Sequence, residues 1–84
     1  MKSPLAILED YFLKAYQEGK NIYVEMTFPD LKENEIIIDR CDSIPQKIDY
    51  YKKNFTEDLI SKENRQIEII SFGTINPSNM PKGL

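Results

Sequence analysis

Carboxylates are the most numerous side chains in this sequence that could do chemistry. It has 14 Asp and Glu residues against 11 Lys and Arg residues, and it has no His. A catalytic carboxylate pair needs partial burial, because burial is what separates the two pKa values. Nearly all Asp and Glu residues fall on the polar faces of the helices and strands that the sequence predicts. Without His, the Ser-His-Asp and Cys-His arrangements of nucleophilic catalysis are also excluded. We therefore expect a protein that is not an enzyme.

The sequence predicts no metal site and no cofactor site. Zinc sites are built from several His and Cys ligands, whereas Cys41 is the only residue of either type. Asp39, Cys41 and Asp42 lie close together, where oxygen ligands could hold a hard cation. A calcium loop, however, repeats its carboxylates at alternate positions and ends with Glu. We interpret the cluster as a solvated turn in which Asp42 caps a following helix.

A second candidate set is basic, and it could bind nucleic acid. Cations beside aromatic rings are typical of proteins that bind single strands, and here Lys52 and Lys53 follow two Tyr residues. The net charge of −3 and the presence of only two Arg residues argue against broad phosphate contact. Nucleic-acid binding is therefore the alternative hypothesis, and it would use Lys47, Lys52, Lys53 and Lys62.

Length and composition predict one small globular domain. The chain has 84 residues, of which 40% are hydrophobic and 30% charged, a mixture too apolar for a disordered chain. It contains no apolar run of the roughly 18 residues that a membrane span needs. A secreted domain of this size usually needs disulfides, and a single Cys cannot form one internally. We therefore expect a cytoplasmic protein that does not cross a membrane.

The first half of the chain has clear signals for one helix and two strands. Ser3 and Pro4 are typical of a helix start and Gly19 of a helix end, which predicts a helix over about residues 4–18. Apolar and polar residues alternate over 21–28, the period of a strand with one buried face. After a loop over 29–34, residues 35–40 predict a second strand around three consecutive Ile residues.

The second half predicts one helix and one strand. From Ile44 an apolar stripe with helical spacing continues to Leu59, and Asn64 and Arg65 mark its end. The stripe consists of Ile44, Ile48, Tyr51, Phe55 and Leu59. Residues 66–72 then predict a third strand.

This order of elements, α-β-β-α-β, indicates an α+β fold. The simplest arrangement is a three-stranded sheet in the order 2-1-3, with both helices covering one face. The domain is expected to span residues 1–75. Residues 76–84 contain two Pro, a Gly and several small polar residues, and they predict a flexible C-terminal tail.

The other face of this sheet has no cover within the folded part. The expected inner residues are Ile22, Val24, Met26, Phe28, Ile36, Ile38, Ile67 and Ile69. The outer face would then expose four large side chains: Tyr23, Ile37, Ile70 and Phe72. An exposed apolar patch usually marks an interaction surface. We predict that it binds a protein partner or a second copy in a homodimer, unless the tail covers it through Ile75, Met80 and Leu84.

The second half also shows a resemblance to known proteins. Its residues include Lys47-Ile48-Asp49-Tyr50-Tyr51-Lys52-Lys53, then Asp58-Leu59 with Lys62, and then Ile67-Glu68-Ile69-Ile70-Ser71-Phe72. Over about residues 43–75 the chain resembles small uncharacterised proteins of Gram-positive phages and prophages. The resemblance implies a cytoplasmic accessory protein of a mobile element and implies no active site. Together with the open sheet face, it favours a non-enzymatic protein-interaction module.

Overall fold

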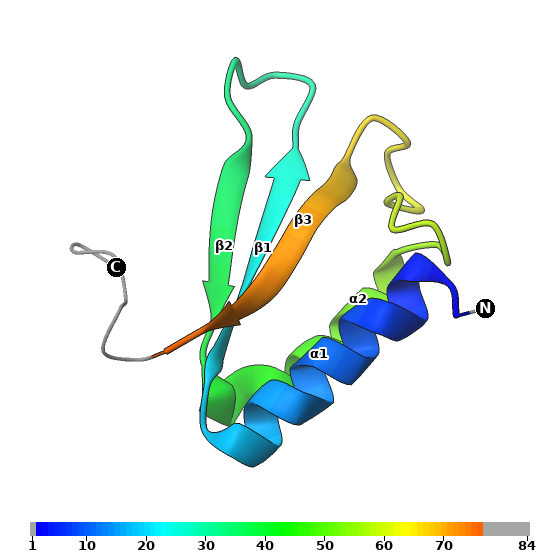
Figure 1. Ribbon diagram of the computed structural model, residues 1–84. Coiled ribbons are helices and arrows are strands. Elements are labelled where there is room, and N and C mark those ends of the chain that lie inside the picture. Colours follow the sequence, from blue (N-terminus) through cyan, green and yellow to red (C-terminus); the bar gives the residue numbers. More distant parts are fainter. Residues whose placement is uncertain (1, 77–84) are drawn as a thin grey trace.

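The computed structural model describes residues 2–76 and has the expected order of elements (Figure 1). A helix and two strands come first, and a single 3-10 turn, Cys41–Ser43, leads into the second helix. The elements are α1 (Pro4–Glu18), β1 (Asn21–Thr27), β2 (Glu35–Asp39), α2 (Ile44–Asn54) and β3 (Glu68–Ile75). The predicted tail, apart from Asn76, lies outside the described residues.

Helix α1 begins and ends where its capping residues predict. The Ser3 hydroxyl accepts a hydrogen bond from the Ala6 N–H at 3.2 Å, which satisfies one of the free donors of the first turn. Gly19 takes the left-handed conformation (φ 71°), and its N–H donates to the carbonyl of Tyr16. The helix buries one stripe of side chains, Leu8, Phe12 and Ala15.

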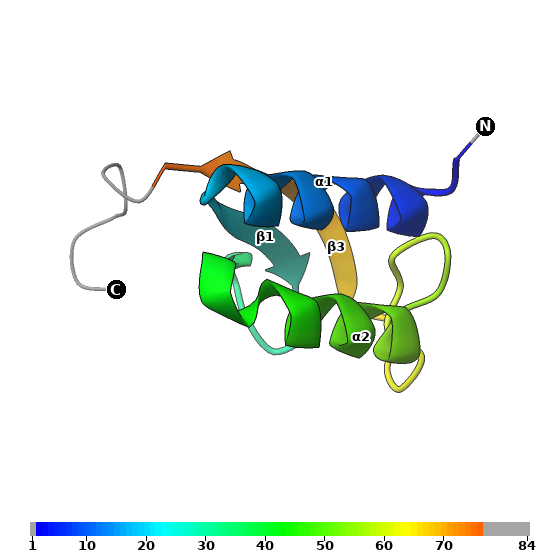
Figure 2. The ribbon, with the colours of Figure 1, turned by 90° about the horizontal axis from the view of Figure 1, so that it is seen from below.

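The sheet confirms the predicted topology. Its order is β2-β1-β3, and β1 pairs with both neighbours in antiparallel orientation. Figure 2, seen from below, shows α1 and α2 side by side in front of the sheet, so both helices cover the same face. The core between these two layers is formed mainly by apolar residues of α1, β1 and α2.

The predicted faces of β2 are wrong. Residues directly opposite each other in an antiparallel pair point to the same face, and Ile37 lies opposite the fully buried Val24. Ile37 therefore points inward and packs on the core, whereas Ile36 and Ile38 point outward. Three Ile residues in a row look alike on both faces, so their alternation alone does not fix which face is buried.

The predicted outward direction of Phe72 is also wrong, because β3 contains a β-bulge. Ser71 pairs with Glu25 and Ile69 pairs with Met26, which leaves Ile70 as the extra residue. The bulge shifts the alternation by one position, so Phe72 points inward. Its ring packs edge-on against Tyr11 of α1, with 5.3 Å between the ring centroids.

Helix α2 ends at Asn54, well before Asn64, the residue that marks the predicted end. Phe55 is already extended, and the Thr56 hydroxyl accepts hydrogen bonds from the N–H groups of Asp58 and Ile60. Such local side-chain bonds compete with helical ones. Phe55 and Leu59 are nevertheless buried, because the chain folds back against the core after the helix.

Candidate functional site

The face of the sheet opposite the helices exposes an apolar surface, which we call the outer-face patch. It consists of Tyr23, Ile36, Ile38 and Ile70. Ile36 is 57% exposed and Ile70 is 48% exposed. Tyr23 and Ile38 lie opposite each other on neighbouring strands and are half-buried. None of the four side chains packs against the core cluster of the described residues. Met80 and Leu84, the tail residues predicted as a possible cover, lie outside the described residues.

The structure divides the four side chains predicted from the sequence. Tyr23 and Ile70 lie on the outer-face patch. Ile37 and Phe72 lie on the inner face and belong to the packing around the core. The sequence reasoning missed Ile36 and Ile38 because it assigned β2 the opposite phase. Ile37 shares its face of β2 with Asp39. A carboxylate usually marks an exposed face, so the sequence does not indicate that this face is the buried one.

Tyr23 is held on this face by a close approach to β3. A Cβ atom added at Gly73, its pairing partner, would lie 2.9 Å from Cε1 of the Tyr23 ring. The ring thus covers the glycine directly, an arrangement that fills the gap left by a residue without a side chain. Next to it on β1, the Glu25 carboxylate accepts a hydrogen bond from the Asn34 side chain at 3.0 Å. The Glu25–Asn34 pair thus lies between Ile36 and Ile70 on the same face as the outer-face patch.

An apolar groove lies on the opposite side, between α2 and the β1–β2 hairpin. Its volume is about 230 Å³, and its walls include Met26, Phe28 and Ile37 from the hairpin and Tyr50 from α2. Lys47 and Glu63 add one charge of each sign to the lining. Ile37, predicted as a surface contact, is therefore part of a wall of this groove.

The last residue of β2 forms a buried polar cluster with α2. Asp39 is only 3% exposed, and its carboxylate accepts a hydrogen bond from the Tyr51 hydroxyl at 3.2 Å. The Lys47 ammonium lies 3.7 Å from the other carboxylate oxygen and is 42% exposed. The sequence reasoning missed this cluster because Tyr51 reads as an ordinary core residue of the apolar stripe.

Burial sets the protonation of the two partners in this cluster. It raises the pKa of the Asp39 carboxyl above its ordinary value, and this effect outweighs the attraction of Lys47 and the hydrogen bond from Tyr51. Burial, together with the Asp39 charge, also raises the pKa of the Tyr51 hydroxyl. Tyr51 therefore remains a hydrogen-bond donor at neutral pH.

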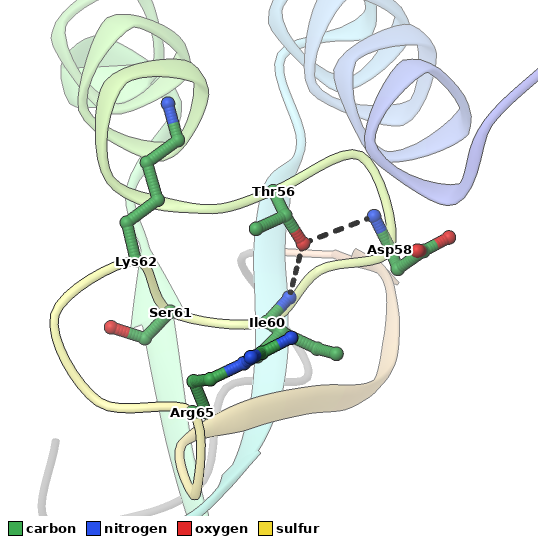
Figure 3. Close-up of a pocket in the computed structure, with 6 residues that line it drawn as sticks. All are labelled: Thr56, Asp58, Ile60, Ser61, Lys62 and Arg65. Carbon is green, nitrogen blue, oxygen red and sulfur yellow. Dashed lines mark hydrogen bonds between the residues drawn. The ribbon is translucent and has the colours of Figure 1, made fainter.

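The segment after α2 forms a hollow that contains hydroxyl groups and cations (Figure 3). Its volume is about 320 Å³, and it is lined by Thr56, Asp58, Ile60, Ser61, Lys62 and Arg65. Both hydroxyl oxygens already accept backbone N–H groups of their own turns: Thr56 from Asp58 and Ile60, and Ser61 from Glu63 and Asn64. In Figure 3 the Lys62 side chain points toward α2 and away from Arg65. The geometry is that of a stabilised turn, without an activated nucleophile.

The four Lys residues of the nucleic-acid hypothesis do not act as one free group. Lys47 is paired with Asp39, and the Lys52 ammonium lies 3.8 Å from the Glu9 carboxylate of α1. Lys53 and Lys62 form no ion pair with any residue in 2–76. Glu57 and Asp58 follow Lys53 in the sequence at or near helical spacing, but α2 ends at Asn54, so they do not share a helix face with it.

The cluster of Asp39, Cys41 and Asp42 does not converge on a common point. The Asp39 carboxylate is turned into the core toward Tyr51, while the Cys41 thiol lies 3.7 Å from the Tyr16 carbonyl at the end of α1. In the described part of the chain, no three His, Cys, Asp or Glu residues are arranged to hold a metal ion. The predicted capping of α2 by Asp42 is not seen either. Neither the 3-10 turn Cys41–Ser43 nor α2 has a side-chain hydrogen bond at its N-cap.

Comparison with known proteins does not assign this chain to a family. No family model, no curated protein and no solved structure matches it. Within residues 2–76, no helix is both long enough and apolar enough to cross a membrane.

Proposed function

We propose that this domain is a non-enzymatic protein-interaction module and that the outer-face patch is its contact surface. The observation that supports the proposal is the exposure of Ile36 and Ile70, about half of each side chain, on the sheet face opposite α1 and α2. The two residues flank Glu25 of β1, two positions along the strand from Tyr23. Exposed apolar groups gathered on one face of a sheet are a common mark of an interaction site. A cytoplasmic accessory protein of a phage or prophage is the context we propose for it.

The chemistry of the other side chains supports a binding role over a catalytic one. The buried Asp39 carboxylate and the Tyr51 hydroxyl bond to each other. The Thr56 and Ser61 hydroxyls are used by their own turns. A general base needs to be within hydrogen-bond reach of a substrate proton, and these groups are committed to the fold.

The test is a capture experiment with the full chain as bait in a nuclease-treated lysate of cells that carry the gene. The variant Tyr23→Lys/Ile70→Lys places two charges on the outer-face patch. Leu13→Lys is the matched control, since Leu13 of α1 is 46% exposed, close to the 48% of Ile70, but lies on the helix layer. We expect one partner protein to bind the wild type and the control and to be lost, by about tenfold or more, with the patch variant.

Two outcomes would overturn this proposal. One is a partner that binds the patch variant as well as it binds the wild type. The other is retention of nucleic acid by the bait in a lysate that has not been treated with nuclease. If this retention weakens steeply between low and moderate salt, it would favour the alternative function, nucleic-acid binding through the Lys residues. All three substituted residues lie outside the core cluster, so we expect an unchanged fold, which circular dichroism of both variants would check.

A further inference from the structure

Glu25 interrupts the apolar surface on the outer face of the sheet. It lies on β1, the central strand (Figure 1), directly opposite Ile36 of β2 and beside the bulge at Ile70 of β3. Residues opposite each other in an antiparallel pair point to the same face, so the Glu25 side chain points outward together with Ile36. Ile36 and Ile70 are the most exposed side chains of the outer-face patch. The carboxylate therefore lies between them.

The charge of this carboxylate is compensated mainly by water. Its Oε2 accepts a hydrogen bond from the Asn34 side chain at 3.0 Å, and Asn34 is itself exposed. Within residues 2–76, Glu25 forms no ion pair. One neutral donor does not compensate a full negative charge once water is removed. Glu25 therefore keeps a need for a further partner whenever this face is covered.

A partner that covers the middle of the outer-face patch has to cover Glu25 as well. Ile36 and Ile70 flank it on the two neighbouring strands, so a surface that buries both removes the carboxylate from water. Burying a charge is strongly unfavourable unless an opposite charge and further hydrogen bonds compensate it. An Arg or Lys side chain of the partner supplies both, and Arg binds a carboxylate through two parallel N–H groups. The carboxylate thus selects for a cation at this point of the partner.

A second carboxylate lies on the same face and has the same requirement. Glu68 of β3 is exposed and pairs with the last residue of β1, two positions along that strand from Glu25. Lys32 and Arg65 lie in the loops next to this end of the sheet, but within residues 2–76 neither forms an ion pair with the two carboxylates. Arg40 follows β2 at the opposite end of the sheet. The charges that the strands place on this end of the outer face are therefore both negative.

We infer that the outer-face patch binds a protein segment in which an Arg or Lys side chain is flanked by apolar side chains. The cation lies against Glu25, and its apolar neighbours cover Ile36 and Ile70. Tyr23 and Ile38, the next pair along the strands on the same face, extend the apolar contact. This inference rests on the proposed function, because it names the chemistry of the partner for the same surface.

The experiment uses a display library of random peptides as the probe, and the selected peptides are measured as dissociation constants against the full chain and three variants. Ile36→Ser/Ile70→Ser removes apolar side chains without changing the charge, and so tests the proposed surface. Glu25→Gln keeps the shape and an acceptor for Asn34, and so tests the inference. Asp49→Asn is the matched control, because it makes the same change of charge at an exposed residue of α2 in the helix layer. None of the four substituted residues belongs to the core cluster, so we expect circular dichroism to show an unchanged fold.

The peptides that bind through the patch are those weakened by the double Ser variant, and we expect them to carry Arg or Lys among apolar residues. Glu25→Gln is expected to weaken them by about tenfold or more, since it leaves the buried cation of the peptide without its partner. Asp49→Asn is expected to leave their affinity unchanged. Replacing the cation of such a peptide with Gln should weaken binding to the wild type to a similar extent. It should have little further effect on the Glu25→Gln variant, because the same interaction is already lost.

Three results would overturn the inference and leave the proposed function in place. One is a set of patch-dependent peptides without Arg or Lys, and another is patch-dependent peptides that bind Glu25→Gln as tightly as the wild type. The third is equal weakening by Glu25→Gln and Asp49→Asn, because general attraction to a chain of net charge −3 would then explain the affinity. If no selected peptide depended on Ile36 and Ile70, the proposed surface itself would be contradicted, and the inference with it.

Discussion

Replacing Phe12 with alanine is expected to remove a large part of the stability of this domain. Phe12 is 1% exposed and stacks on Tyr51, with ring centroids 5.4 Å apart, where α1 meets α2. Truncating a buried Phe to Ala removes about 3–5 kcal/mol, because the contacts are lost and a cavity remains. A folded unit of this length has a free energy of unfolding of about 4–11 kcal/mol. Urea unfolding followed by circular dichroism would measure the difference.

Leu13→Ala is the control for this prediction, since it changes the next residue of the same helix. Leu13 is nearly half-exposed and does not belong to the core cluster. Its replacement is expected to change the free energy of unfolding by less than about 0.5 kcal/mol. If the two variants were destabilised equally, the assignment of the α1 core stripe would be wrong.

The parts of the fold that the sequence predicts correctly are those with two agreeing local signals. Ser3 and Gly19 bracket a helix whose apolar stripe has the right period, and both caps form as expected. In β1, Ile22, Val24 and Met26 form the one face that is apolar throughout, because Glu25 and Thr27 lie on the other, and all three are buried. When the capping residues, the apolar period and the polarity agree, only one local structure and one buried face fit the sequence, and tertiary contacts do not change them.

The faces of β2 and β3 could not be predicted because they are set by pairing. Ile36, Ile37 and Ile38 fit either face equally well, and only the register with β1 selects Ile37 for the core. In β3 the bulge at Ile70 turns Phe72 inward, and a bulge in an apolar run has no signature in one sequence. Half of the predicted interaction face was wrong for this reason.

The apolar stripe after Ile44 illustrates a further limit of periodicity. Phe55 and Leu59 have helical spacing and are buried, yet both lie beyond the end of α2. Residues four apart can also both be buried when the chain leaves the helix and turns back to the core. Here the Thr56 hydroxyl accepts from the N–H groups of Asp58 and Ile60, in place of the backbone carbonyls that would accept in a helix. The stripe therefore predicted which residues are buried and not the length of the helix.

Asparagine at position 39 is expected to change how the stability of this domain depends on pH. Burial raises the pKa of the Asp39 carboxyl, so the folded protein holds this proton more tightly than the unfolded chain. The contribution of Asp39 to stability is then full below its unfolded pKa and is lost as the pH rises through the raised folded value. Asn has the same shape and a carbonyl acceptor for Tyr51, but no charge to be desolvated. The stability of Asp39→Asn relative to the wild type should therefore increase with pH over this window.

Asp39→Ala separates the effect of the charge from that of the hydrogen bond. It removes the charge as well, but it leaves the largely buried Tyr51 hydroxyl without its acceptor. An unsatisfied buried donor is destabilising by about 1–3 kcal/mol, so this variant should be less stable than Asp39→Asn at every pH. Urea unfolding from pH 4 to pH 8 would measure the free energy of unfolding of all three proteins. The other carboxylates are common to the three, so their pH dependence cancels in the differences. A constant difference between the wild type and Asp39→Asn would contradict the raised pKa, because a carboxyl with the same pKa in both states adds no pH dependence.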